Sequence, residues 1–220
     1  MSYQRASMLS LSLIFCLWSL EVSAQDPTRF AETIERYNSE ERAFPDDQSI
    51  VFVGSSSIRK WESLTEDFPD HKVINRGFGG SVMSDLFYYW KELILAYQPK
   101  QIFIYEGDND ISRSKSTNAI MDTTKLLVSK IRASLPNTTI VFIAAKPSVE
   151  RWHRRKNYLL LNEALSEYTC RHDYLDFANI WDPMLGDNGL IRSDLFIKDG
   201  LHMNAKGYEI WTKVIGPLLK

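Results

Sequence analysis

From residue 27 onward, short apolar runs rich in Val, Ile and Phe alternate with longer segments whose apolar residues recur at helical spacing. The short runs predict strands at 50–53, 72–74, 101–105, 139–143 and 174–175. The longer segments predict helices at 28–42, 58–64, 82–97, 117–134, 151–172 and 205–218. This alternation is typical of a parallel sheet whose crossover connections are helices. The fold class expected is therefore α/β.

Composition limits the classes of protein that the chain can belong to. Its 220 residues fit one globular domain, and the formal net charge is only -2. Lys and Arg are scattered among Asp and Glu, with no basic stripe of the kind that tracks a phosphate backbone. We therefore expect no nucleic-acid partner.

The first 24 residues are typical of a signal peptide. Arg5 is followed by an apolar run over 8–20 and then by Val22, Ser23 and Ala24, a small-residue cleavage pattern. A membrane anchor is the alternative, but the run is shorter than the roughly 20 apolar residues that span a bilayer. We expect a leader over 1–24, a single domain over 25–220, secretion to the periplasm or medium, and no stable membrane insertion. Cys170 would then be the only thiol, and its helical setting predicts a small core residue.

Residues that could take part in catalysis or binding follow three of the predicted strands. Gly54-Ser55-Ser56-Ser57 places a hydroxyl in a strand-to-helix turn, where it could act as a nucleophile or cap the helix. The glycines of the 75–81 segment could present N–H groups to an oxyanion or serve only the turn. In Glu106-Gly107-Asp108-Asn109-Asp110, the Asn109 amide could donate to the same oxyanion, cap a helix or belong to a cation site. All three segments lie at the carboxyl ends of parallel strands, where ligands bind in open α/β sheets.

A fourth segment near the C-terminus combines a carboxylate with an imidazole. Asp199 stands three residues before His202, in a loop ahead of a helix that Asn204 could cap. Such an aspartate can fix the tautomer of the imidazole and stabilise the imidazolium as it forms. The other histidines (His71, His153 and His172) have no comparable setting and are expected to be surface or packing residues.

Taken together and in this order, the four segments resemble the conserved blocks of the GDSL or SGNH hydrolase family. The resemblance runs from about residue 50 to the C-terminus, and the Gly-Ser-Ser-Ser turn is similar to a branch that includes platelet-activating factor acetylhydrolase subunits. It implies a flavodoxin-like three-layer α/β/α fold and ester hydrolysis without a cofactor or metal. It also implies the catalytic residues Ser56, Asp199 and His202, and an oxyanion hole formed by Ser56, Gly80 and Asn109. Ser55 departs from the family, which has Asp at this position.

Two other readings remain open at this point. One is a non-catalytic carbohydrate-binding module on the same fold, with a groove lined by aromatic residues drawn from Trp61, Phe87, Tyr88, Tyr89, Trp90, Trp152 and Trp181. The other is a metal-dependent phosphoesterase with Asp108, Asp110, Asp199 and His202 as ligands. Short connections between the predicted elements favour a small acyl group, such as an acetyl or other short-chain acyl ester carried on a carbohydrate or a lysolipid. The sequence predicts neither the substrate nor the oligomeric state.

Overall fold

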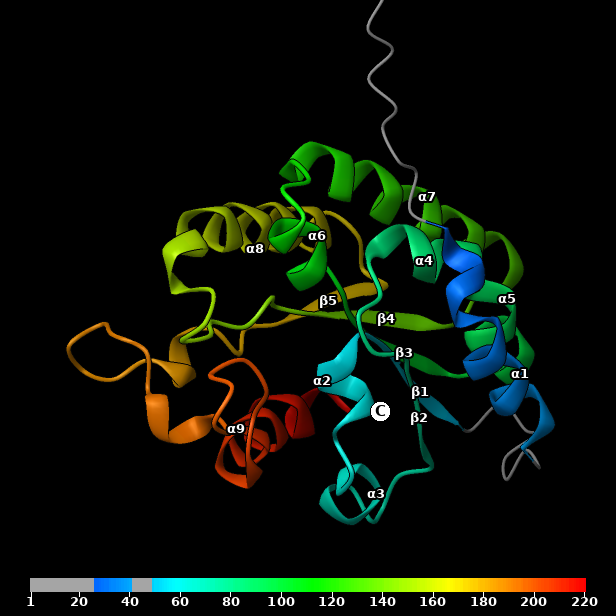
Figure 1. Ribbon diagram of the computed structural model, residues 1–220. Coiled ribbons are helices and arrows are strands. Elements are labelled where there is room, and N and C mark those ends of the chain that lie inside the picture. The colour runs from blue at the N-terminus through cyan, green and yellow to red at the C-terminus, as the bar shows by residue number, and fades with distance from the viewer. Residues whose placement is uncertain (1–25, 41–48) are drawn as a thin grey trace, which may run out of the picture.

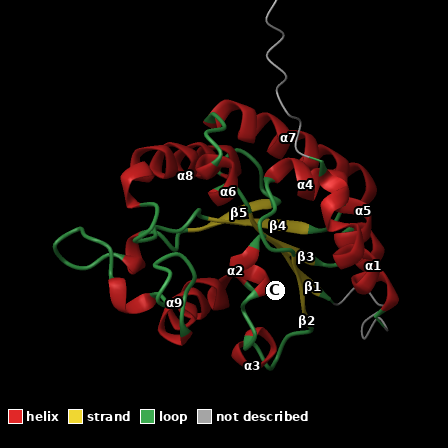
Figure 2. Cartoon of the chain, viewed as in Figure 1, coloured by secondary structure: helices red, strands yellow, loops and turns green. Residues whose placement is uncertain are grey.

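The computed structural model describes residues 26–40 and 49–220 of the chain. The predicted leader over 1–24 lies outside these residues, as does the end of the first predicted helix. Within them, a parallel sheet has helices on both faces, which gives three layers (Figures 1 and 2). The strands are β1 (Ile50–Gly54), β2 (Val73–Gly77), β3 (Gln101–Tyr105), β4 (Thr139–Ile143) and β5 (Leu175–Ala178).

Helices of the described residues divide between the two faces of the sheet. On one face lie α1 (Ala31–Ser39), α4 (Met83–Tyr88), α5 (Trp90–Leu93), α7 (Thr117–Ser134) and α8 (Arg155–Thr169); on the other lie α2 (Ser56–Arg59), α3 (Leu64–Asp67) and α9 (Ala205–Ile215). The short α6 (Asp108–Ser112) follows β3. None of these helices is long and apolar enough to cross a bilayer.

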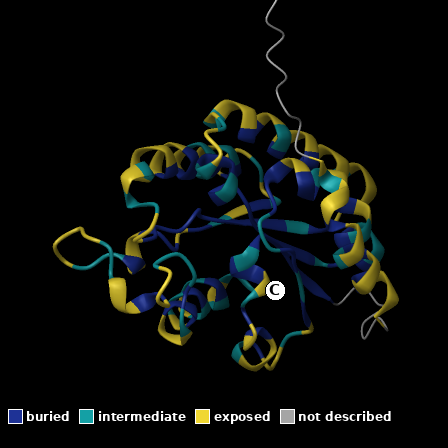
Figure 3. Ribbon diagram, viewed as in Figure 1, coloured by how far each residue is buried: buried dark blue, intermediate teal, exposed yellow. Residues whose placement is uncertain are grey.

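Each strand feeds two hydrophobic cores because successive side chains point to opposite faces. Val51 and Val53 of β1 pack under the first group of helices, whereas Ile50 and Phe52 pack toward α2, α3 and α9. Figure 3 shows the result: the sheet is mostly buried, and the exposed residues lie mainly on the outer faces of the helices and in the connecting loops. The flavodoxin-like architecture predicted from the family resemblance is confirmed.

The strand order is β2-β1-β3-β4-β5. The chain therefore leaves β1 to form β2 on one side of it, and then returns across β1 to form β3 on the other side. The switch point of the topology therefore lies between the carboxyl ends of β1 and β3, and this is where α/β sheets bind ligands. The predicted serine turn and the Asn109 segment follow these two strands.

The edge strands begin and end later than the sequence predicts. β2 continues through Asn75 and Arg76 to Gly77 because an edge strand tolerates polar residues on its open side. β5 likewise runs on through the exposed Asp176 to Ala178. The central strands β3 and β4 occupy the predicted 101–105 and 139–143.

Several helices differ from their predicted lengths. The helix predicted over 58–64 is instead two short helices, because the Asn75 amide donates to the Ile58 and Trp61 carbonyls and ends the first. The helix predicted over 82–97 is interrupted at Tyr89, although the bonds from Tyr89 N to Asp85 O and from Leu93 N to Tyr89 O carry the helical path across. The helix predicted over 151–172 is α8 preceded by a single 3-10 turn, Trp152–Arg154, and the one predicted over 205–218 ends as α9 followed by the 3-10 turn Gly216–Leu218.

The prediction of a buried Cys170 is wrong, since its side chain is exposed. Leu161, Leu165 and Thr169 form the buried face of α8. Cys170 follows Thr169 by one position, about 100° around the helix, and therefore lies off that face.

Candidate active site

The Ser56 hydroxyl, the His202 ring and the Asp199 carboxylate form a continuous chain of hydrogen bonds. The distance from Ser56 Oγ to His202 Nε2 is 2.9 Å, and that from His202 Nδ1 to Asp199 Oδ2 is 2.6 Å. An ionised carboxylate can only accept, so Nδ1 carries a proton and Nε2 of a neutral ring is left as the acceptor for the Ser56 hydroxyl. The fold thus aligns a hydroxyl with a base although the two residues are 146 positions apart.

The local sequence around His202 folds into a tight loop that presents the ring. Asp199 Oδ1 accepts hydrogen bonds from the N–H groups of Leu201 and His202, both at 2.9 Å. Gly200 has a φ of 64°, a backbone conformation that favours glycine. Asn204 caps α9 by accepting from the Gly207 N–H, as the sequence predicts. The carboxylate therefore shapes the loop with one oxygen and holds the imidazole with the other.

Asp199 stays ionised at neutral pH. Its slight burial works against the charge, but the hydrogen bonds from the His202 ring and from the His202 and Leu201 N–H groups lower its pKa to about 2. The side chain of Asp199 is 44% exposed and that of His202 is 18% exposed. A substrate can therefore reach the pair from solvent.

Ser56 is the first residue of α2 and follows the sharp turn at the end of β1. Gly54 has a φ of 137°, and a Cβ there would lie 2.0 Å from the Tyr105 carbonyl oxygen, so only glycine fits. Ser55 donates its N–H to Tyr105 O and makes no side-chain capping bond. The Ser56 N–H has no acceptor in the part of the chain that the structure describes. The turn therefore presents both the Ser56 hydroxyl and an unused donor.

Gly80, in the loop after β2, and Asn109, in α6, lie in segments that are joined to each other. Asn109 Nδ2 donates to the carbonyl of Ser81 at 2.9 Å, next to Gly80. Gly80 has a φ of 85°, and the space where a Cβ would stand is empty. Its loop contacts the serine turn, since Phe78 N donates to Gly54 O at 2.8 Å. The two predicted oxyanion donors thus lie in segments that adjoin the serine turn on neighbouring strands.

Sequence reasoning missed a group of buried polar residues behind this edge of the sheet. Lys146 follows β4 and is fully buried, and Glu106 and Asp108 follow β3 and are also buried. Burial, and then the charge of Asp110, raise the pKa of Glu106 well above its usual range, and its carboxyl accepts a hydrogen bond from Ser81. Glu106 and Asp108 belong to the segment already singled out after the third predicted strand, whereas Lys146 stands three residues after the end of β4 and in no recognisable motif.

The carboxylates of Asp108 and Asp110 form ion pairs and hydrogen bonds within the protein, which does not fit their predicted role as metal ligands. Asp108 pairs with Arg151, and Asp110 pairs with Lys115 and accepts from the Met83 N–H. Residues 26–40 and 49–220 contain no group of three or more His, Cys, Asp or Glu side chains placed to hold a metal ion.

The aromatic residues named for a carbohydrate groove lie mostly in the core. Trp61, Tyr89, Trp90 and Trp181 are buried, and Tyr88 is the exposed one of the helical set at 56%. Trp152 packs against Trp181 with ring centroids 6.0 Å apart. Trp61, Tyr89 and Trp90 therefore stabilise the interior, whereas Trp181 also lines a surface pocket between α8 and β5.

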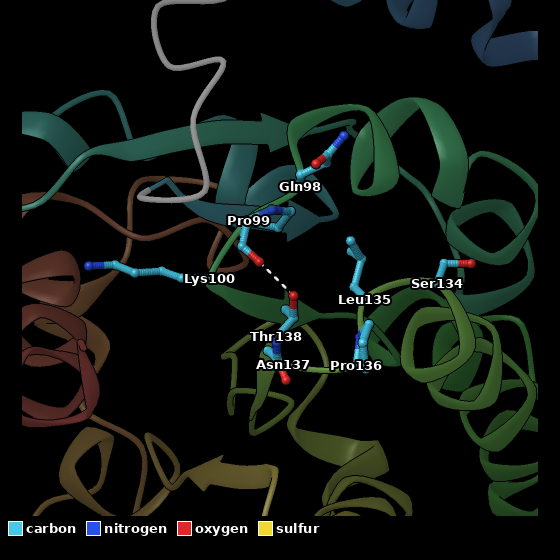
Figure 4. Close-up of a pocket in the computed structure, with 8 residues that line it drawn as sticks. All are labelled: Gln98, Pro99, Lys100, Ser134, Leu135, Pro136, Asn137 and Thr138. Carbon is cyan, nitrogen blue, oxygen red and sulfur yellow. Dashed lines mark hydrogen bonds between the residues drawn. The ribbon is translucent and has the colours of Figure 1, made fainter.

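A surface pocket lies at the opposite edge of the sheet. Figure 4 shows it between the segments that precede β3 and β4, where Thr138 Oγ1 donates to Pro99 O at 2.6 Å. None of Ser56, His202 or Asp199 lines it. The pocket therefore has no part in the chemistry of the serine turn.

Comparison with protein families finds the GDSL-like Lipase/Acylhydrolase family over residues 47–210. Among curated proteins, an N-acylneuraminate cytidylyltransferase of Escherichia coli O18:K1:H7 is 25% identical over 191 residues. The match covers 84% of this chain but only 43% of that protein, so the chain spans less than half the length of its curated relative.

Solved structures share the fold at lower sequence identity. A protein provisionally named as a platelet activating factor from Streptococcus pneumonia has a TM-score of 0.77 at 19% identity, covering 88% of this chain and 92% of that one. An acetylxylan esterase from Geobacillus stearothermophilus, solved as a catalytic serine-to-alanine mutant, has a TM-score of 0.66 at 15% identity, covering 78% and 94%.

Proposed function

The chain belongs to the GDSL-like lipase/acylhydrolase family. From this premise we propose that it is a hydrolase of ester bonds, which cleaves carboxylic esters through an acyl-enzyme at Ser56. The observation that carries the proposal is the hydrogen-bonded chain from Ser56 Oγ through the His202 ring to Asp199. Nucleophile, base and orienting carboxylate stand in the order that acyl transfer needs.

The reaction follows from this geometry in two halves. His202 Nε2 takes the Ser56 proton as Oγ attacks the ester carbonyl carbon, and the imidazolium then gives that proton to the departing alcohol. In the second half, His202 takes a proton from water as the water oxygen attacks the carbonyl carbon of acyl-Ser56, and the imidazolium then returns that proton to Ser56 Oγ as the bond to the acyl group breaks and the acid leaves. Asp199 stays ionised throughout and stabilises the imidazolium in both halves.

Charge that develops on the carbonyl oxygen requires donors already in place. We assign this role to the N–H groups of Ser56 and Gly80 and to the Asn109 amide. Three observations support the assignment: the Ser56 N–H has no acceptor among the described residues, the space beside Gly80 is open, and Asn109 of α6 donates to the carbonyl of Ser81, next to Gly80. Such preorganised donors are typically the largest single contribution to acyl-transfer catalysis.

Catalytic mutants of the acetylxylan esterase support the assignment of Ser56, His202 and Asp199 as the catalytic residues. They include changes at a serine, at a histidine and at an aspartate three residues before that histidine. Asp199 and His202 have the same spacing in this chain.

We propose acetyl or other short-chain acyl esters, carried on a carbohydrate or a lysolipid, as substrates. The connections that follow β1, β2 and β3 at the carboxyl edge of the sheet are short, whereas the connection from β5 to α9 spans residues 179–204 and carries Asp199 and His202. A solved structure of the same fold is an acetylxylan esterase. A small acyl group is therefore favoured over a long one.

A chain-length series of p-nitrophenyl esters tests both parts of this function. Wild type should hydrolyse the acetate faster than the octanoate or longer esters, and Ser56→Ala should be inactive with an unchanged Tm. Preference for long-chain esters would contradict the proposed size of the acyl group but not the proposed mechanism. If Ser55→Ala or Ser57→Ala is the inactive variant instead, the nucleophile is another serine of the turn.

We also propose that the protein is exported and that residues 1–24 are removed, which leaves one hydrolase domain over 25–220. Support comes from the charged, apolar and small-residue order of that segment. Mass spectrometry of the protein recovered from its producing cells should find an N-terminus at Gln25. An intact N-terminus on the cell-bound protein would contradict it.

A further inference from the structure

A cluster of three charged residues, two buried and one partly buried, lies next to the proposed oxyanion hole. Its members are Arg151, Asp108 and Lys146, with side chains 16%, 7% and 1% exposed. Arg151 Nη1 lies 2.6 Å from Asp108 Oδ1, and Lys146 Nζ lies 3.6 Å from Asp108 Oδ2. Tyr105 and Tyr158 also donate their hydroxyls to the Asp108 carboxylate. We call this the Asp108 cluster.

Charges this well buried contribute little net stability, because the cost of removing them from water offsets their attraction. Burial works against the charge on Asp108, but Lys146 and Arg151 outweigh it and lower its pKa. The carboxylate is therefore ionised and holds both cations. The further hydrogen bonds of Arg151 and Lys146 indicate a role other than stability.

The first cation holds the Asn109 amide. Arg151 Nη1 lies 3.2 Å from Asn109 Oδ1, and on the other side Asn109 Nδ2 donates to Ser81 O. If the amide were rotated by 180°, its N–H groups would face the guanidinium and its oxygen would face the Ser81 carbonyl. Both contacts would be repulsive, so only one orientation is stable. One N–H of Nδ2 then remains for a substrate oxygen.

The second cation holds the loop that carries His202. Lys146 Nζ donates to the Leu201 carbonyl at 2.7 Å. That carbonyl belongs to the peptide group whose N–H, on His202, donates to Asp199 Oδ1. A neighbouring bond from Glu150 N to Gly200 O at 3.1 Å ties the segment after β4 to the same loop.

We propose that the Asp108 cluster is the positioning device of the site, in which Arg151 fixes the Asn109 amide while Lys146 fixes the loop of Asp199 and His202. The proposal rests on the serine-esterase function above. One carboxylate thereby sets the distance between the oxyanion donor and the base. Arg151 and Lys146 act through other residues and touch no reacting atom.

The test is a double-mutant cycle between Arg151→Met and Asn109→Ala, measured as kcat and KM on p-nitrophenyl acetate. Loss of Arg151 should lower kcat about 10- to 100-fold, the order expected when a catalytic group is misplaced by about an ångström. KM should change little, because the ground-state ester does not contact Arg151. In the Asn109→Ala background, Arg151→Met should lower kcat no further, since the group it positions is already gone.

Arg154→Met is the matched control. Arg154 lies on the same segment and donates to the Ile111 carbonyl of α6, but it contacts neither Asp108 nor Asn109. Its removal should leave kcat and KM unchanged, and its effect should add independently to that of Asn109→Ala. A loss of kcat in Arg154→Met equal to that in Arg151→Met would mean that catalysis needs any cation that contacts α6, rather than Arg151 in particular. That result would overturn the proposal.

Arg151→Lys serves if Arg151→Met fails to fold. It keeps a positive charge beside Asp108 but cannot reach Asp108 and Asn109 together, so kcat should fall while Tm is retained. Unchanged kcat in the folded variant, losses that multiply in the cycle, or a rise in KM alone would each refute positioning by Arg151. Wild-type turnover reports separately on the proposed function: if wild type is inactive while Ser56 cannot be acylated, the esterase proposal itself has failed.

Discussion

Replacement of Asp199 by Asn tests the role of the carboxylate with little change in shape. Asp199 Oδ1 accepts from the N–H groups of Leu201 and His202, and an asparagine oxygen can keep both bonds. The new Nδ2 then stands where Oδ2 faced His202 Nδ1 at 2.6 Å. An amide N–H there is a donor, so Nδ1 must become the acceptor and the ring proton moves to Nε2. In this tautomer His202 cannot accept the proton of Ser56.

The size of the loss follows from this tautomer change. Asparagine in place of a buried triad aspartate lowers kcat by about 10⁴-fold. Because the Asp199 side chain is 44% exposed, water can restore part of the correct tautomer. We therefore expect a fall of about 10³- to 10⁴-fold, equivalent to about 4–5 kcal/mol in the activation barrier. The larger part of the loss comes from hydrogen-bond direction and the smaller part from the lost charge that stabilises the imidazolium, so the loss should depend only weakly on salt.

The assay is kcat on p-nitrophenyl acetate at neutral pH and at two salt concentrations, together with Tm. Asp194→Asn is the control, because Asp194 is an exposed aspartate of the same C-terminal region whose side chain forms an ion pair with Arg192 and does not contact His202. It should behave as wild type. If Asp199→Asn keeps more than about a tenth of wild-type kcat, well above the expected range, Asp199 does not set the tautomer of His202.

Two further predictions concern the neighbouring residues. Asn109→Ala should lower turnover about 10²- to 10³-fold with Tm unchanged, because one oxyanion donor is lost; near-normal turnover would remove Asn109 from the site. Glu106 has a raised pKa in the fold, so its contribution to stability is present at low pH and is lost as pH rises through that value. The Tm of Glu106→Gln relative to wild type should therefore rise between about pH 5 and pH 8, and a constant or falling difference would contradict the assignment.

Strands buried on both faces were predictable, whereas the edges of the sheet were not. β3 and β4 read as continuous apolar runs because helices cover both of their faces, and their limits matched the sequence. β2 and β5 carry Asn75, Arg76 and Asp176, polar residues that an edge strand accommodates. Edge strands therefore resemble loops in a pattern of hydrophobic positions.

The proposed catalytic residues were accessible to sequence reasoning because each one follows a strand or precedes a helix in a short motif. The residues that brace them were not. Lys146 is charged, and charged residues are almost always exposed, so a fully buried lysine has no signature in hydropathy. Its partners Asp108 and Leu201 lie 38 and 55 positions away, a pairing that only the folded chain reveals.

The central claim is that Ser56 is the nucleophile activated by His202, and covalent labelling with a fluorophosphonate tests it most directly. The serine oxygen should displace fluoride from phosphorus, and peptide mass spectrometry should locate the adduct on Ser56. His202→Ala should abolish labelling while the protein remains folded. An adduct on another residue, or no adduct on a protein that hydrolyses esters, would contradict the mechanism.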